Sequence, residues 1–195
     1  MERLVPYHVI DLPDGSPSGP LLFRWQDREA SILANSPGRI VVKENPERSG
    51  QAPLHAFHAA GQAPVELFDP IIRREAARLG VDANLVRAIM YVENAQGQYG
   101  KPFEGIGAKS ILPMNIRYDK WAGLGFSERD FFDATMNIRA GVTLIRRILD
   151  RLDEPTVSKV ATLYNSLPKD SVSDFGARVA EVYRTRAWER KDRRD

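Results

Sequence analysis

The sequence predicts a mainly α-helical protein with a small N-terminal annex that contains short β-strands. After residue 67, apolar residues recur at helical spacing, whereas the first 66 residues hold short apolar runs separated by proline and glycine. A chain of 195 residues, 43% hydrophobic and 28% charged, is typical of one globular domain with a smaller addition. We therefore divide it into an annex, 1–66, and a helical domain, 67–195.

The annex is predicted from its turn-forming residues. Short strands are expected at 7–12, 21–25 and 38–43, and the run 44–64, rich in proline and glycine, is expected to be a linker. His55 and His58 are spaced for one metal ion but lack a third ligand nearby, so we expect ordinary surface residues there. We expect no metal and no cofactor.

Capping signals set the limits of the predicted helices. An N-cap residue followed by proline marks a helix start, and a glycine after the last apolar position marks a stop. The expected starts are Asp69 (before Pro70), Asp82, Asp133 and Thr156, the first helix stops at Gly80, and Phe175, Val179 and Val182 define the last helix.

Glu93 is the first candidate functional residue. It lies four residues after Ile89 and seven after Val86, on the apolar stripe of its helix. Burial favours the neutral carboxylic acid, and cleavage of an acetal bond requires such a proton donor at neutral pH. The polar run 94–100, with two glycines, is expected to end the helix there and leave Glu93 accessible. The alternative is an ordinary polar residue at a helix end.

Composition excludes several classes of function. The net charge of +2 and the absence of a nucleic-acid motif argue against DNA or RNA binding, and the basic run 184–195 is expected to be a solvated helix end. No stretch approaches the ~20 apolar residues that cross a bilayer, so no membrane partner is expected. The chain has no cysteine. Its start does not resemble a Sec signal peptide, which predicts synthesis in the cytoplasm without an ordinary export signal.

Four segments in order carry a family resemblance. They are the helix that leads to Glu93, GAKSILPMNI at 107–116, DFFDATMNIRAG at 130–141 and ATLYNS at 161–166. Their order and spacing resemble the catalytic domain of the soluble lytic transglycosylases, within the lysozyme-like superfamily. The resemblance covers residues 67 to about 188 and leaves the first 66 unexplained.

The resemblance implies a lysozyme-like helical domain and a role for each matched residue. Glu93 takes the position of the general acid/base, and Tyr164 is expected to orient Glu93 or the sugar. The alternative for Tyr164 is a core residue whose hydroxyl is satisfied locally. Asn94 stands where the family usually has serine, and Asn115 where it has glutamine. The expected substrate-binding residues are Asn94, Met114, Asn115, Asn165, Tyr99 and Trp121, with Phe103 as a further stacking residue, while Trp188 is expected to pack against the last helix.

The sequence leaves the reaction type open. A glycoside hydrolase commonly needs a second carboxylate, for which Glu104 is the best candidate and Asp119 the next, although both also fit solvated loop acids. A lytic transglycosylase of this kind needs none, because the sugar's N-acetyl group assists and its own hydroxyl closes an anhydro ring.

The predicted function is cleavage of the glycan strands of peptidoglycan, as a lytic transglycosylase or as a muramidase or glucosaminidase. Without a signal peptide, two settings fit: an antibacterial toxin of a contractile (type VI) secretion system, or a wall-penetrating enzyme of a phage or conjugation system. A toxin would act in the periplasm of a target cell after non-classical secretion, and a cognate immunity protein would occlude its cleft. One alternative is a non-enzymatic glycan-binding or scaffold module of the same fold, favoured by Asn94, Pro113 and the pair Ser166-Leu167, which depart from the family pattern. The other is an unrelated helical interaction domain.

Overall fold

The computed structural model describes residues 39–45, 58–97, 110–111, 113–167 and 169–189. This part of the chain is mainly helical, as predicted. Its elements are α2 (His58–Leu79), α3 (Ala83–Gly97), β1 (Ser110–Ile111), β2 (Ile116–Arg117), α4 (Tyr118–Trp121), the 3-10 helices η2 (Ala122–Leu124) and η3 (Glu128–Phe132), α5 (Ala134–Arg151), α6 (Val157–Asn165), α7 (Asp174–Thr185) and the 3-10 helix η4 (Ala187–Glu189).

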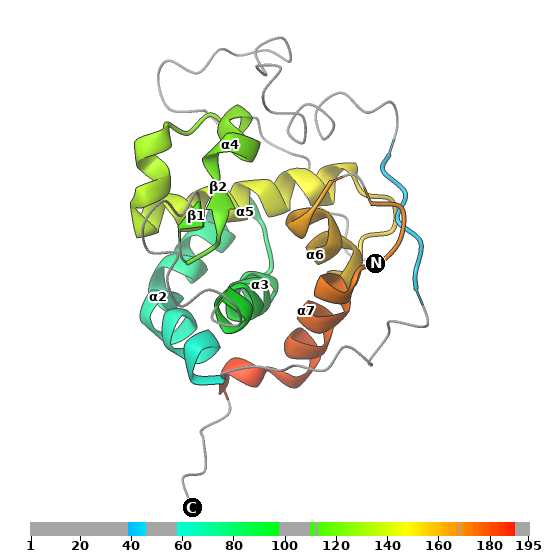
Figure 1. Cartoon of the computed structure of the whole chain (residues 1–195), viewed down its shortest axis with the longest axis horizontal. Helices are drawn as coiled ribbons and strands as arrows, with labels where there is room; N and C mark the ends of the chain where they lie inside the picture. Colours follow the sequence, from blue (N-terminus) through cyan, green and yellow to red (C-terminus); the bar gives the residue numbers. More distant parts are fainter. Residues whose placement is uncertain (1–38, 46–57, 98–109, 112, 168, 190–195) are drawn as a thin grey trace, which may run out of the picture.

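Helix α3 lies at the centre of the molecule. Figure 1 shows it nearly end-on, with α2, α5, α6 and α7 around it. It packs directly against α2 and α7, and the surrounding helices contact one another in turn, α2 with α5, α5 with α6 and α6 with α7. Ile89, Met90 and Tyr91 of α3 have no exposed surface and belong to one hydrophobic core shared by these helices. A functional group on α3 that faces this shared core is therefore largely screened from water.

Most of the predicted helix starts are confirmed. The Asp82 carboxylate accepts the Asn84 amide at 2.8 Å, and Asp133 and Thr156 accept the backbone amides of Met136 and Lys159. Gly80 follows α2 with a φ of 61°, as expected for a glycine that ends a helix. Trp188 is buried, as predicted. Local capping chemistry thus sets these limits.

The predicted start of the first helix is wrong. Helix α2 begins at His58, inside the expected linker, and Pro64 and Pro70 lie within it. Asp69 is not its N-cap, because its carboxylate pairs with Arg73 at 2.7 Å and with Arg87 at 2.6 Å. The additional turns pack on the core, where a Cβ atom at Gly61 would lie 2.9 Å from the Tyr91 ring. The expected boundary at 66 falls inside α2, and the division into two domains stays a prediction.

Residues 39–45 form a strap rather than the strand expected at 38–43. Ile40 makes an isolated parallel bridge to Leu152, and Lys43 makes another to Ser171. These contacts lie in the segments before and after α6, and Val42 between them is buried. The strap therefore joins both ends of α6. The other predicted strands, at 7–12 and 21–25, lie outside the described residues.

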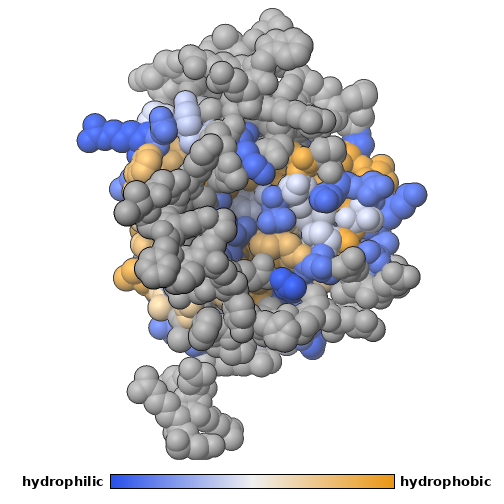
Figure 2. Space-filling model, in the orientation of Figure 1, coloured by the Kyte–Doolittle hydropathy of each residue, from blue (hydrophilic) through white to orange (hydrophobic). Residues whose placement is uncertain are grey.

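The surface shown in Figure 2 mixes hydrophilic and hydrophobic residues wherever the structure describes them. Large exposed apolar side chains in the described ranges are Val41, Leu67 and Phe132. None of the described helices has the length and hydrophobicity needed to cross a membrane.

Candidate active site

Glu93 lies on the inner side of α3, with only 8% of its surface exposed. The helix ends at Gly97, within the run 94–100 that was predicted to stop it, and about one turn beyond Glu93. The position on the apolar stripe, and not the helix end, is what buries the carboxyl group. The burial predicted from the spacing of Glu93 to Val86 and Ile89 is confirmed, since both of these residues are also buried.

Burial raises the pKa of the Glu93 carboxyl from 4.5 to about 7, and a hydrogen bond from Asn115 partly opposes this rise. The Asn115 amide donates from Nδ2 to Oε2 at 2.6 Å. Because Oε2 accepts this bond, the proton of the neutral acid belongs on Oε1. At neutral pH the group is therefore poised to give up or take one proton at a defined oxygen.

Asn115 reaches Glu93 from the turn between β1 and β2. Its φ of 53° lies in the left-handed region, which asparagine adopts more readily than most residues. The side chain was predicted to bind sugar, and the structure instead directs its amide nitrogen to the Glu93 carboxylate. Asn115 itself is exposed, whereas Glu93 is 8% exposed.

Three side chains from three helices hold this turn through its backbone. Asn94 of α3 donates to the Pro113 carbonyl at 2.8 Å, and Asn137 of α5 accepts the Met114 amide at 2.9 Å. Tyr164 of α6 donates to the Met114 carbonyl at 2.6 Å. Since buried backbone groups need partners, these three bonds fix the segment that directly precedes Asn115. We call Pro113, Met114 and Asn115 the acid-facing turn.

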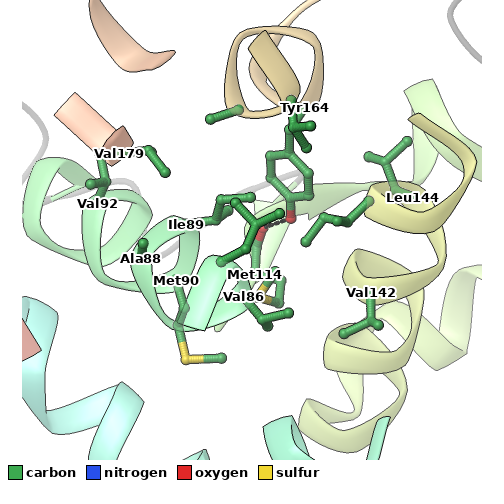
Figure 3. Close-up of a cluster of buried hydrophobic side chains, with 14 of the residues drawn as sticks. Val86, Ala88, Ile89, Met90, Val92, Met114, Val142, Leu144, Tyr164 and Val179 are labelled. Carbon is green, nitrogen blue, oxygen red and sulfur yellow. Dashed lines mark hydrogen bonds between the residues drawn. The ribbon is translucent and has the colours of Figure 1, made fainter. Parts of the chain in front are cut away.

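Tyr164 acts on this turn and does not bond to Glu93. Figure 3 shows its ring among α3 and α5 side chains, with the hydroxyl bonded to Met114. The hydroxyl is thus satisfied locally by a backbone carbonyl, which is the alternative that the sequence left open, and a contact between Tyr164 and the sugar stays a prediction. Burial, and then the nearby Glu93 charge, raise the pKa of Tyr164 well above its usual value, so the phenol stays protonated.

Three predicted substrate-binding side chains are buried. Met114 has no exposed surface, and Asn94 and Trp121 are each 4% exposed. A sugar ring cannot stack on Trp121 in this position, because the indole packs in the core. The side-chain amide of Asn94 donates hydrogen bonds to the Met90 and Pro113 carbonyls. These residues support the site from inside.

Two residues of the matched segment 130–141, Asn137 and Gly141, contact the acid-facing turn. Asn137 binds the Met114 amide through Oδ1 and the Phe131 carbonyl through Nδ2. One turn later, a Cβ atom at Gly141 would lie 2.8 Å from Cε of Met114. Glycine is therefore needed for α5 to approach the acid-facing turn this closely.

Of the remaining predicted site residues, only some lie among the described residues. Asn165 is exposed at the last position of α6. Asp119 lies in α4, and its side chain is outside the described part. Tyr99, Phe103 and Glu104 fall in 98–109, which is also outside it. Among the described residues no cluster of histidine and acidic side chains suits a metal ion.

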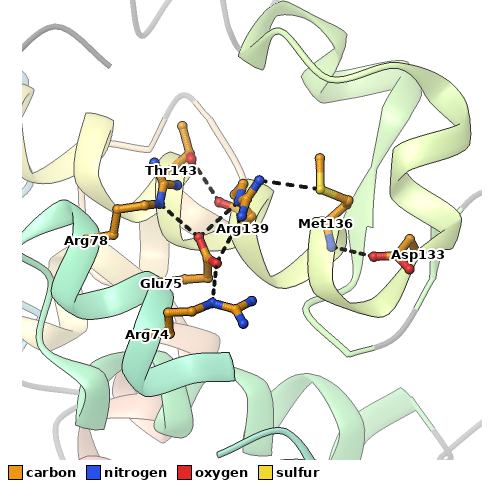
Figure 4. Close-up of polar contacts among 7 residues, drawn as sticks. All are labelled: Arg74, Glu75, Arg78, Asp133, Met136, Arg139 and Thr143. Atoms are coloured by element: carbon orange, nitrogen blue, oxygen red, sulfur yellow. Dashed lines mark hydrogen bonds and ion pairs between the residues drawn. The ribbon is translucent and has the colours of Figure 1, made fainter. Parts of the chain in front are cut away.

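A second buried carboxylate, Glu75, was missed. It is 1% exposed on α2, and Arg139 of α5 binds it at 3.0 Å together with Arg74 and Arg78 (Figure 4). Burial raises its pKa, but the hydrogen bonds from Arg139, Arg78 and Arg74 together lower it to about 2. Glu75 follows Ile72 by three residues, so the stripe argument applied to Glu93 would also have found it.

Comparison with known proteins finds relatives of one name. The chain is 30% identical to membrane-bound lytic murein transglycosylase C of Histophilus somni (strain 2336) in an alignment of 139 residues that covers 66% of this chain. It is 32% identical over 125 residues to the proteins of that name from Haemophilus influenzae (strain PittEE) and Glaesserella parasuis serovar 5 (strain SH0165), covering 58% of this chain and 34% of each relative. The alignment with the Histophilus protein spans 38% of it.

No protein-family profile matches the chain, and no solved structure does. Among these comparisons, the family resemblance is therefore supported by the curated relatives. The chain spans little more than a third of the length of these relatives. Their names and the helical architecture of the described residues support the predicted relationship to lytic transglycosylases of the lysozyme-like superfamily.

Proposed function

We propose that this protein cleaves the glycan strands of peptidoglycan with Glu93 as its general acid and base. The observation that carries the proposal is a buried carboxyl group whose pKa is raised to about 7, held by an amide from a fixed turn. General acids work best when their pKa lies near the working pH. The similarity to proteins named lytic murein transglycosylase supports peptidoglycan as the substrate class.

The proposed reaction uses one carboxyl group twice. Neutral Glu93 gives its Oε1 proton to the glycosidic oxygen while the bond from that oxygen to the anomeric carbon breaks. The resulting carboxylate then takes the proton from a hydroxyl of the same sugar, whose oxygen bonds to the anomeric carbon and closes an anhydro ring. Asn115 keeps Oε2 hydrogen-bonded through both steps, so the same oxygen, Oε1, loses and regains the proton.

We favour this single-acid route over hydrolysis with two carboxylates. The similarity to proteins named lytic murein transglycosylase supports this choice, and burial and the hydrogen bond from Asn115 are the two causes that set the raised pKa of Glu93. Glu104, the candidate second acid, lies outside the described ranges, so its role stays a prediction.

Purified peptidoglycan sacculi provide the test. The wild-type protein and Glu93→Gln are incubated with sacculi, and mass spectrometry identifies the released fragments. We expect anhydro products, each lighter by one water than the hydrolysis product, from the wild type alone. Reducing-end products would show a hydrolase. Absence of release by the wild type would overturn the enzymatic proposal and favour the non-enzymatic binding module.

The proposed substrate also fixes where the activity must appear. Peptidoglycan lies outside the cytoplasmic membrane, so we propose that the protein acts in the periplasm. Expression in the cytoplasm should be harmless, whereas fusion to a periplasmic export signal should lyse cells, and Glu93→Gln should abolish lysis. Equal toxicity from the cytoplasm would indicate another target. Delivery as a secreted toxin with an immunity partner stays a prediction.

A further inference from the structure

We infer that Asn94 is a positioning residue, which holds the acid-facing turn so that Asn115 stays hydrogen-bonded to Glu93. Its importance for catalysis rests on the proposed function, whereas the contacts themselves do not. Asn94 directly follows Glu93 on α3, and it binds Pro113, two residues before Asn115. One amide group therefore links the helix that carries the acid to the turn that carries the partner of the acid.

The Asn94 amide uses both of its protons in this link. Nδ2 donates to the Met90 carbonyl, one turn earlier on α3, at 2.6 Å and to the Pro113 carbonyl at 2.8 Å. The first bond fixes the side chain against its own helix, and the second carries that orientation to the turn. Since the side chain is 4% exposed, water competes little for either bond.

A hydroxyl side chain cannot make the same link. Serine has one donor, and on a helix that donor commonly bonds to the carbonyl four residues earlier, which here is Met90. The Pro113 carbonyl would then lose its partner. The asparagine also has a cost, because its Oδ1 is buried without a hydrogen-bond partner. The two-donor amide offers a reason for an asparagine to occupy this position despite that cost.

The rest of the turn has separate support. Asn137 and Tyr164 hold the amide and the carbonyl of Met114 from α5 and α6. Loss of the Asn94 link should therefore loosen the turn on its Pro113 side while the Met114 core contacts remain. We expect Asn94→Ser to fold, and we expect the hydrogen bond from Asn115 to Glu93 to be formed in a smaller fraction of the molecules.

The pKa of Glu93 reports this change without requiring activity. The Glu93 carboxyl signal is followed by carbon-13 NMR as pH is varied, with Glu93→Gln used to assign it. Because the Asn115 hydrogen bond lowers this pKa, Asn94→Ser should raise it. Tyr164, the neighbouring titratable group identified in the described part, stays protonated in this range. Asn84→Ser, on the same helix with its side chain bonded to Arg87, is the matched control and should leave the pKa unchanged.

A double variant separates positioning from general destabilisation. If Asn94 acts through Asn115, then Asn94→Ser should raise the Glu93 pKa in the wild type and cause no further rise in Asn115→Ala. An unchanged pKa in Asn94→Ser, or an equal rise in both backgrounds, would overturn the inference. Should Asn94→Ser fail to fold, Asn94→Thr, which has one donor and fills more space, takes its place.

Sacculus cleavage, measured in parallel, keeps the two proposals apart. In the wild type, absence of cleavage contradicts the proposed function and leaves the NMR result valid for the link between Asn94 and Asn115. If the wild type cleaves glycan, the pH above which activity falls should move upward in Asn94→Ser together with the pKa. An active Asn94→Ser with an unmoved pH profile would contradict the positioning role.

Discussion

Glu75 and Glu93 are two buried carboxyl groups on neighbouring helices with opposite protonation. Glu75 on α2 is 1% exposed and Glu93 on α3 is 8% exposed. Both lie on the apolar face of their helix. Yet the pKa of Glu75 falls to about 2, whereas that of Glu93 rises to about 7. The extent of burial does not decide the charge of an acid, because the partners that remain after burial decide it.

The partners differ in charge and number. Three arginines converge on Glu75, and all of them keep part of their surface in solvent, which lessens the cost of holding the ion pairs. Glu93 receives one neutral amide from Asn115, which opposes the desolvation only in part. Glu75 therefore stays ionised and joins α2 to α5, while Glu93 can carry a proton at neutral pH. This separation of roles suits a protein that needs one acid for structure and another for chemistry.

The largest expected effect of a change at either acid is on activity. Glu93→Gln removes the ionisable proton but keeps nearly the same shape, so glycan cleavage should fall by at least ~10²-fold with the fold retained. Fragment release from sacculi measures activity, and circular dichroism checks the fold. Near-wild-type turnover in Glu93→Gln would contradict the role of Glu93 as general acid and base. Glu75 and Glu93 would then no longer differ in function.

At Glu75 the main expected effect is on stability. Glu75→Gln leaves three guanidinium groups around a neutral side chain, and the free energy of unfolding should fall by about 2–3 kcal/mol. Denaturant unfolding measures this change. Glu181→Gln is the control, because the Glu181–Arg184 pair lies on the surface and should contribute little. Activity per folded molecule should survive in Glu75→Gln, and its loss would show that Glu75 also serves the reaction.

The two acids should also give the stability opposite pH dependences. The folded-state pKa of Glu75 is depressed, so its contribution is present above pH 4.5 and is lost as pH falls toward 2. That of Glu93 is raised, so its contribution is complete below pH 4.5 and is lost as pH rises through 7. The loss from Glu93 should approach about 3 kcal/mol.

Unfolding experiments between pH 4 and 8 isolate the Glu93 part of this dependence. Glu93→Gln should flatten the decline in stability over this range, so that the variant is more stable than the wild type at pH 8. Glu75→Gln should keep the decline, because Glu75 is ionised throughout most of it. Parallel curves for the wild type and Glu93→Gln would show that the carboxyl is not desolvated as described.

Local signals in the sequence predicted most of the helix starts, and the one wrong start is a local signal that tertiary packing overrides. Asp82, Asp133 and Thr156 cap the expected helices, because a cap depends on residues within one turn. The start of α2 was misplaced because Asp69 and Pro70 form a start signal that long-range packing overrides. There Asp69 binds Arg87 from the next helix, a contact that periodicity does not reveal.

The candidate site was predicted in part for the same reason. The burial of Glu93 follows from its spacing along one helix, and the sequence suffices for that. The acid-facing turn depends on Asn94, Asn137 and Tyr164 from three helices, so their convergence on Pro113 and Met114 requires the tertiary structure. Met114 and Trp121 were assigned to substrate because composition cannot distinguish an aromatic or thioether in the core from one at the surface.

The smallest expected effect tests the partner of Glu93 and leaves the acid itself unchanged. Asn115→Ala removes the amide donor to Oε2, and since this hydrogen bond lowers the pKa of Glu93, the pKa should rise. The acid would then remain protonated to higher pH, so the pH at which glycan cleavage falls on the alkaline side should move upward. Some maximal rate should be lost as the carboxyl gains freedom to rotate.

The matched control is Asn165→Ala, because Asn165 is an exposed asparagine at the end of α6. Its pH profile should not move even if substrate affinity changes. A downward movement of the profile in Asn115→Ala would mean that the amide stabilises the neutral acid. The contrast with Glu75, whose partners all favour the ionised form, would then be sharper than the present contacts indicate.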